Sequence, residues 1–334
     1  MTACAGSENK FGPRTRQDLC SVRLNRLRIA LGLLWLLDGV LQLQPAMFTQ
    51  DFVTSLEQNV MAQPPWFAHT ILRMVAWIGP HIAIWNGAFA VLQLGLGTGI
   101  LWPRTSKLAL GLSCVWALAL WWFGEGLGSI LTGFGSLLAG APGAALLYAI
   151  TALVVWPTTT SGGTAPAGAG LLGEHRTRGV WAALWCGVAY LQVKPGLSFS
   201  YRAAANFQEL SIGEPSYLMH LDHAMQRFGQ RWGTPLSIAL AAIEVLVGVG
   251  VVVGRSRRMS LGASFFLLAA VWVLGQNAGA LLTGSGTDPG AAPLFGLLAL
   301  ALWPVALEER PTADGRAGRA RRTSTMVFAP DSEP

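Results

Sequence analysis

Eight apolar segments, each close to the length of a membrane-crossing helix, follow one another along this chain. They occupy residues 27–44, 80–101, 107–123, 141–156, 179–193, 235–254, 259–275 and 290–304. A helix needs about 20 mostly apolar residues to cross a bilayer. Only 12% of the residues are charged, whereas soluble domains carry about 25%. The sequence therefore predicts an all-α, polytopic membrane protein with eight transmembrane helices in contact with the lipid bilayer.

Positively charged residues gather in every second connection between these segments. The connections after the second, fourth and sixth segments and both ends of the chain are basic, whereas 124–140 and 276–289 contain no Lys or Arg. Short basic connections stay in the cytoplasm, so we expect both termini there. Because Arg far outnumbers Lys, and Ala and Gly are abundant, the composition resembles that of GC-rich bacteria. We therefore expect a multi-pass protein of the bacterial plasma (inner) membrane.

The net charge of +6 does not indicate a nucleic-acid partner. The charges lie in short clusters between apolar segments rather than along one face. Such clusters are typical of membrane topology signals. The chain also lacks a P-loop, an HExxH motif and a haem-binding CxxCH motif, which argues against ATP-driven transport by this chain alone.

Three blocks of sequence recur in the second half at offsets of 150, 151 and 147 residues. The matched blocks are Trp35–Pro45 with Trp185–Pro195, Trp121–Gly133 with Trp272–Gly284, and Pro142–Pro157 with Pro289–Pro304. Internal repeats of this kind indicate two copies of one structural unit. A unit of four helices has an even number of crossings, so we expect two parallel four-helix repeats related by an axis along the membrane normal.

The repeat and the polar segments around it predict five regions. These are a cytoplasmic N-terminal tail (1–26), a first membrane repeat (27–157), a cytoplasmic linker (158–178), a second membrane repeat (179–307) and a disordered cytoplasmic tail (308–334).

Three carboxylates fall within or at the ends of the apolar segments. Asp38 and Glu244 lie near the middle of theirs, and Glu125 lies at the outer end of the third. Ionisable groups inside a bilayer are costly and mark functional sites by default. Our hypothesis is that Asp38 and Glu244, with Glu125, line an internal polar path for a proton, a cation or a quinone head group. The alternative is that each is a neutral acid that only hydrogen-bonds a neighbouring helix.

Further polar residues cluster at the predicted outer ends of the segments. They are Gln42, Gln192 and Lys194 after the first and fifth segments, and Thr132, Gln276, Asn277 and Thr283 after the third and seventh. The glycines around them favour broken or re-entrant backbone, which membranes tolerate only around a cavity or within protein. We expect an outer-leaflet pocket in each half. The alternative is that these Gly and Thr residues only pack helices together.

Two histidines, His220 and His223, are spaced to lie on one face of a helix. This pair alone is a weak candidate metal site, because a metal needs three or four ligands. An amphipathic helix at the membrane interface accounts for the same segment. We therefore expect no metal site.

One stretch of the second half resembles a known family. It consists of Ala242–Val245 with Gly248, Gly250, Gly254 and Arg255, followed by Leu261 and Gly262. This stretch is similar to the second-to-third helix segment of the DoxX/DoxD-like four-helix membrane proteins, and the opening of the first half, Arg28–Gly32 with Gly39, is similar to that family's first helix. The segment Val91–Gly97 keeps the glycine spacing but lacks the glutamate, which puts the glutamate's role in the first half in doubt.

This resemblance implies two fused copies of the family's fold and a link to thiosulfate:quinone oxidoreduction or to redox membrane complexes. We therefore expect an accessory subunit in quinone-linked redox or sulfur metabolism, with quinone as the cofactor and a redox membrane complex as the partner. The symmetric halves and intramembrane acids favour a second function, a proton-coupled small-molecule or ion permease. The long outer connection at 196–232 leaves a third, a membrane scaffold for an exported partner.

Overall fold

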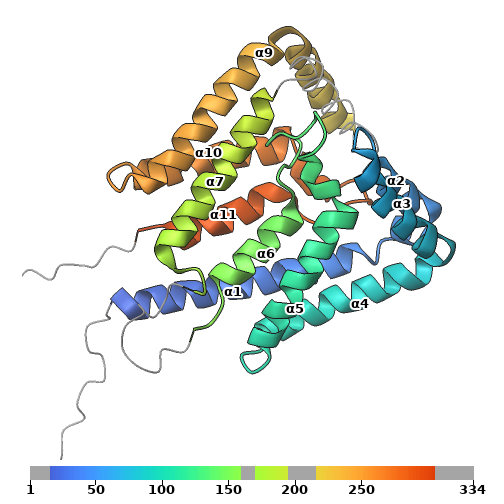
Figure 1. Ribbon diagram of the computed structural model, residues 1–334, viewed down its shortest axis with the longest axis horizontal. Helices are drawn as coiled ribbons and strands as arrows, with labels where there is room; N and C mark the ends of the chain where they lie inside the picture. Colours follow the sequence, from blue (N-terminus) through green and yellow to red (C-terminus); the bar gives the residue numbers. More distant parts are fainter. Residues whose placement is uncertain (1–15, 159–169, 195–215, 305–334) are drawn as a thin grey trace, which may run out of the picture. The chain divides into compact units, whose positions relative to one another are not determined.

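Helices make up all the regular structure of the described residues. The computed structural model describes residues 16–158, 170–194 and 216–304 (Figure 1). Its helices are α1 (Arg16–Leu41), α2 (Gln50–Gln58), α3 (Pro65–Ile78), α4 (Ile82–Leu101), α5 (Ser106–Ala119), α6 (Ala144–Val154), α7 (Gly173–Val193), α9 (Ser216–Val252), α10 (Arg257–Leu274) and α11 (Ala291–Leu302). The all-α prediction is confirmed for these ranges. Each of the eight predicted apolar segments overlaps one α-helix.

Several of these helices have the length and composition of membrane spans. Within the described ranges, Pro65–Leu101, Ser106–Gly124, His223–Val252 and Arg257–Leu274 are long and apolar enough to cross a bilayer. Large apolar side chains point outward from them, for example Ile84 (71% exposed). The chain thus has the features of a multi-pass membrane protein whose helices contact lipid.

Two of the predicted spans form shorter helices than expected. α6 has 11 residues and α11 has 12. At 1.5 Å per residue each is about 16–18 Å long, whereas the hydrocarbon core of a bilayer is about 30 Å thick. α6 begins at Ala144 rather than at 141 and α11 at Ala291 rather than at 290, and each ends two residues before its predicted segment does. Irregular backbone, at 125–143 or 275–290, precedes each helix.

Two boundaries differ from the predicted ones. α1 begins at Arg16 rather than at residue 27, and α7 begins at Gly173, inside the predicted linker 158–178. The polar residues before position 27 contain no Pro or Gly from Arg16 onward, so nothing in this stretch stops the helix. The tail 308–334, most of the linker and most of the long outer connection lie outside the described residues.

The helices pack in the same pairs in both halves. α1 lies against α4 in the first half, and α7 lies against α9 in the second. Likewise, α5 lies against α6 in the first half, and α10 lies against α11 in the second. The α1–α4 crossing is close: a Cβ added to Gly97 would lie 2.7 Å from the carbonyl oxygen of Gly32. Trp35, Trp181 and Trp185 are fully buried in one apolar cluster that includes residues of both halves.

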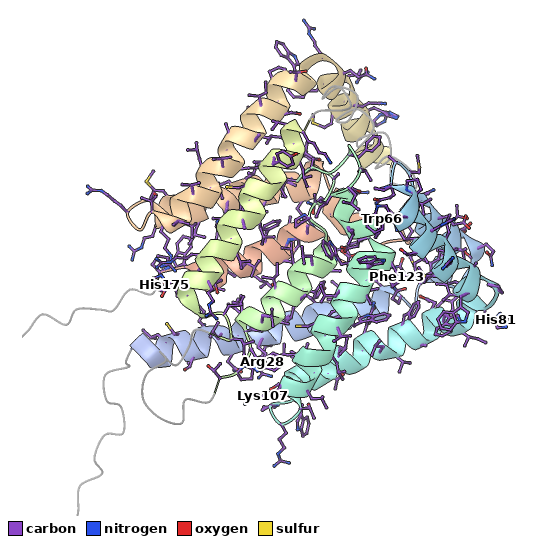
Figure 2. All side chains as sticks on the ribbon, in the orientation of Figure 1. Arg28, Trp66, His81, Lys107, Phe123 and His175 are labelled. Atoms are coloured by element: carbon purple, nitrogen blue, oxygen red, sulfur yellow. The ribbon has the colours of Figure 1, made fainter. Side chains whose placement is uncertain are left out.

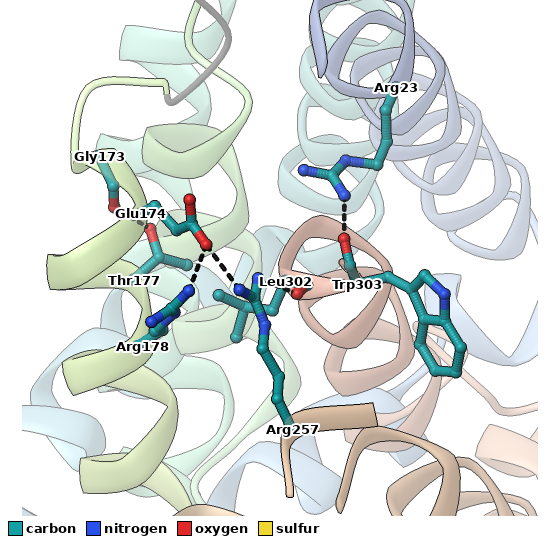
Figure 3. Close-up of polar contacts among 8 residues, drawn as sticks. All are labelled: Arg23, Gly173, Glu174, Thr177, Arg178, Arg257, Leu302 and Trp303. Carbon is teal, nitrogen blue, oxygen red and sulfur yellow. Dashed lines mark hydrogen bonds and ion pairs between the residues drawn. The ribbon is translucent and has the colours of Figure 1, made fainter. Parts of the chain in front are cut away.

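Arginine side chains hold several helix ends together. Arg257 donates to Glu174 at 2.6 Å and also to the carbonyl of Leu302 at the end of α11, and Arg23 donates to the carbonyl of Trp303 (Figure 3). Arg28 donates in the same way to the carbonyl of Ile100 in α4. The last carbonyls of a helix have no partner within it, and a guanidinium satisfies them.

The contact of Arg28 with Ile100 lies at the C-terminal end of α4. Figure 2 shows Arg28 and Lys107 at this end, with His81 at the opposite end of α4. Two basic residues far apart in the sequence therefore lie near the same end of α4.

Glu174 is the carboxylate that joins α7 to α10. Partial burial opposes its ionisation, but hydrogen bonds from Arg257 and Arg178 outweigh this effect and lower the pKa of Glu174. A lowered folded-state pKa means that the stabilisation is present above the unfolded-state pKa and is lost as pH falls through the folded one.

We expect Glu174→Gln to lower the free energy of unfolding at neutral pH by about 1 kcal/mol, because Glu174 is partly exposed but Arg257 is buried. The difference from the wild type should shrink as pH falls through the lowered folded-state pKa of Glu174 and vanish below it, where both states carry a neutral side chain. Thermal denaturation in detergent at neutral and acid pH measures it. Glu57→Gln, at an exposed position of α2, is the control, and a difference that persists at acid pH would contradict the ionic explanation.

Candidate functional site

A partly open cavity of ≈ 350 Å³ lies among the helices of the first half. Side chains from α1 to α6 line it, together with two residues from the turn before α11. Its polar lining consists of Asp38, Gln42, Gln93, Glu125, Tyr148, Thr287 and Asp288. Its aromatic lining consists of Phe52, Trp77, Trp85, Phe89, Trp116, Phe123 and the ring of Tyr148. Small-molecule sites combine such apolar walls with a few polar groups.

Asp38 reaches the cavity from the buried face of α1. Leu31, Trp35, Asp38 and Gln42 follow the helical repeat along this face, and all four are buried. Asp38 is 2% exposed, and its Oδ1 atom has no hydrogen-bond partner among the described residues. The end of α1 is fixed beside it, because Asn86 of α4 donates to the carbonyl of Gln42 at 2.7 Å.

Glu125 reaches the cavity from the turn after α5. One carboxylate oxygen accepts from the backbone N–H of Ala145 at 2.9 Å, in the first turn of α6. A helix N-terminus carries partial positive charge and free N–H groups, so it favours an acidic side chain there. The other oxygen, Oε2, has no hydrogen-bond partner among the described residues and remains available to a ligand in the cavity.

Asp288 comes from the second half of the chain, and the sequence reasoning missed it. It accepts from the backbone N–H of Gly290 at 2.8 Å and from the hydroxyl of Thr287 at 3.0 Å, which fixes the turn before α11. Gln44, at the end of α1, donates to the carbonyl of Gly286 at 3.1 Å and holds this turn over the first half. The sequence did carry a signal for it. When the two repeats are aligned, Asp288 in the second repeat corresponds to Ala141 in the first, so only one repeat has an acid at this position.

The three carboxyls share one cavity without a basic neighbour. None of the described lining residues is Lys, Arg or His, and the charges of Asp288 and Glu125 both act on the Asp38 carboxyl. Like charges in a site of low dielectric constant cannot all remain ionised without compensation. The cavity can therefore hold protons, a bound cation or both.

Glu244 lies elsewhere. It is fully buried on α9, and both carboxylate oxygens lack a hydrogen-bond partner among the described residues. It does not line the cavity that contains Asp38 and Glu125. The structure thus brings together two of the three predicted acids, and the predicted path through Asp38 and Glu244 has no shared cavity in the described part of the chain.

Three of the seven residues of the predicted outer-leaflet pockets make contacts of another kind. Gln276 donates to the carbonyl of Leu137 at 2.9 Å and accepts from the N–H of Ala292 at 3.2 Å. Thr132 and Thr283 each donate to a carbonyl within their own turn. The structure therefore gives both threonines a role in fixing a turn.

The remaining members of these predicted pockets are scattered. Gln192 and Asn277 are buried, Lys194 ends α7, and none of the three lines the cavity. Of the predicted set only Gln42 does so, beside Asp38. The weak metal candidates His220 and His223 are exposed on α9, and the described residues contain no group of three potential ligands that could hold a metal ion.

α2 and α3 close one side of the cavity and are fastened beside Glu125. Asn59 donates to the carbonyl of Gly124 at 2.6 Å, and Gln63 donates to the carbonyl of Gly126 at 2.8 Å. These two amides hold the α2–α3 pair against the turn that carries the carboxylate, so the wall and the acid are positioned together.

We expect the double variant Asn59→Leu with Gln63→Leu to loosen the α2–α3 wall. Each hydrogen bond contributes about 1 kcal/mol, so protection from hydrogen exchange in 50–78 should fall about 10- to 30-fold. Exchange measured by mass spectrometry tests this. Gln58→Leu, at an exposed position of α2, is the control. Equal loss of protection in the control would contradict the role of the two amides.

Comparison with models of known protein families, with curated proteins and with solved structures finds no match for this chain. The functional argument therefore rests on the cavity and the residues that line it.

Proposed function

We propose that all eight apolar segments cross a bacterial plasma membrane as two parallel four-helix repeats of DoxX/DoxD-like fold, with both termini in the cytoplasm. Matching contacts in the two halves support this topology. In the first half, the indole of Trp121 donates to the carbonyl of Pro142 at 2.7 Å. In the second, Trp272 donates to the carbonyl of Pro289 at the same distance. These positions belong to the blocks that repeat in the sequence.

The short helices α6 and α11 fit this topology if irregular backbone completes their crossing. The segments 125–143 and 275–290 hold several left-handed residues and precede these helices. Irregular backbone is tolerated at membrane depth where protein surrounds it or where it lines a cavity. Glu125 and Asp288 lie in these two segments, so the same irregularity delivers both acids to the cavity.

Within this topology, we propose that the protein is a proton-linked permease for a small molecule, with the cavity as its binding site. The observation that carries the proposal is the convergence of Asp38, Glu125 and Asp288 from three elements onto one cavity without a basic lining residue. Acids inside membrane bundles commonly serve as proton relays.

Proton movement in liposomes tests this function. Purified full-length protein is reconstituted with an enclosed pH-sensitive dye, and small cationic, neutral and anionic solutes are added in turn. We expect at least one solute to move protons faster than in protein-free liposomes, and Asp288→Asn to slow this movement. Asp51→Asn, an exposed aspartate of α2, is the matched control. Equal rates for the wild type and Asp288→Asn would contradict the proposal.

A second function remains open because of two donors in the cavity. The hydroxyl of Tyr148 and the indole N–H of Trp116 line it. The indole has no hydrogen-bond partner among the described residues, whereas the hydroxyl interacts with the Asp38 carboxyl. Such donors suit the carbonyl oxygens of a quinone, which the DoxX/DoxD-like resemblance implies as a cofactor within a redox membrane complex. Mass spectrometry of the protein purified from its native membrane tests this. A stoichiometric quinone or redox enzyme would favour this function over the permease.

A further inference from the structure

We propose that the ligand of the cavity is a small organic monocation that carries N–H donors and an apolar, preferably aromatic, group. This inference rests on the proposed function, in that it names the substrate class of the same site. It follows from the charge of the lining, from the balance of acceptors and donors, and from the nature of the walls.

The acidic lining, in which no described residue is basic, disfavours an anion. Asp38, Glu125 and Asp288 face the cavity from α1, from the turn after α5 and from the turn before α11, and Tyr148 of α6 is the remaining titratable group of the lining. A further negative charge would meet three acids without a basic neighbour. A positive charge compensates them instead, because buried charges persist when they are paired.

The balance of acceptors and donors favours a ligand that donates hydrogen bonds. Among the described residues, the lining oxygens without a partner are Asp38 Oδ1, Gln42 Oε1, Gln93 Oε1 and Glu125 Oε2. The lining donor without a partner is Trp116 Nε1, whereas the Tyr148 hydroxyl interacts with the Asp38 carboxyl. Buried polar atoms normally have partners. A ligand with several N–H groups satisfies the oxygens that are in excess.

The walls favour an organic cation over a metal ion. Trp77 and Trp85 lie with ring centroids 4.4 Å apart, and the rings of Phe89 and Trp116 are 5.3 Å apart. The faces of aromatic rings attract cations, with Trp the strongest. A divalent metal ion would need several ligands in fixed geometry, and no group of three His, Cys, Asp or Glu in the described ranges could provide it.

The size of the cavity limits the ligand. At ≈ 350 Å³, the volume is at the small end of the range for small-molecule sites, about 300–1,000 Å³. It accommodates an amine with one or two rings. Binding should weaken as pH falls, because protonation of the carboxyls removes the charge that attracts the cation.

A matched set of three small probes tests the assignment. Phenethylammonium is the cation, phenethyl alcohol is its neutral analogue, and phenylpropionate is the anion. Binding to the purified full-length protein is followed by calorimetry and by tryptophan fluorescence at neutral pH. We expect the cation to bind at least about tenfold more tightly than the alcohol, the anion to bind least, and affinity for the cation to fall on acidification.

Variants complete the test. Asp38→Asn should reduce the preference for the cation over the alcohol to about threefold or less, since it removes one of the charges that attract the ligand. Asp51→Asn should leave it unchanged. If the alcohol or the anion binds as tightly as the cation, the substrate class is overturned while the cavity remains the binding site. If none of the three binds, the cation assignment fails, and the proton movements in liposomes decide separately on the permease.

Discussion

Asp38→Asn should reduce solute-driven proton movement in liposomes about 100-fold. The loss of a buried carboxylate that contacts a charged partner removes about 2–3 kcal/mol of interaction, and each 1.4 kcal/mol corresponds to a factor of about ten. Asp38 is 2% exposed and lies on the cavity, so bulk water does not replace the lost group. Asn keeps the size of the side chain, and therefore the variant should fold.

Glu244→Gln distinguishes the cavity from the predicted path through both acids. Glu244 is fully buried but does not line the cavity. If the cavity is the binding site, Glu244→Gln should keep the rate of proton movement within about threefold of the wild-type rate, because this substitution removes no contact with the ligand. A path through Asp38 and Glu244 predicts that both variants fail. Full activity of Asp38→Asn would contradict both mechanisms and leave Asp38 as a neutral structural acid.

Gly128→Ala should lower the free energy of unfolding by about 3 kcal/mol, from overpacking and a left-handed Cβ together. Gly128 has φ = 59°, and a Cβ there would lie 2.1 Å from the carbonyl oxygen of Pro142. Its neighbours Leu127 and Ser129 also have positive φ, so the left-handed backbone alone is tolerated. The contact with Pro142 is what excludes a side chain, and the backbone before α6 would have to move.

Gly279 provides a second test of the same contact in the other half. It has φ = 72°, and a Cβ there would lie 2.4 Å from the carbonyl carbon of Pro289, so Gly279→Ala should have a similar effect. Gly87→Ala in α4 is the control, because nothing lies within 4 Å of its added Cβ and Ala favours a helix. Thermal denaturation in detergent measures all three. Equal stability of the Gly128 and Gly87 variants would contradict the close approach.

The positions of the helices could be predicted from the sequence because they depend on local composition. A backbone in lipid must satisfy its own hydrogen bonds, so an apolar segment becomes a helix wherever it is inserted. Asp38 and Glu125 could be identified as site residues for a related reason, because a carboxylate in such a segment is costly unless it has a function. The lengths of α6 and α11 could not be predicted from local composition. Tertiary contacts of Trp121 and Trp272 stabilise the irregular turns before these helices.

Only the tertiary structure decided which residues belong to the candidate site. Asp288 belongs to it because Gln44 holds the turn before α11 against the end of α1, a contact between residues far apart in the chain. Glu244 is excluded although it is as buried as Asp38, because its helix packs against α7 rather than α1. Sequence by itself determined where the apolar helices lie and which acids are costly to bury. Which of those acids share a cavity depended on how helices and turns pack, since side chains meet through long-range contacts that local composition does not encode.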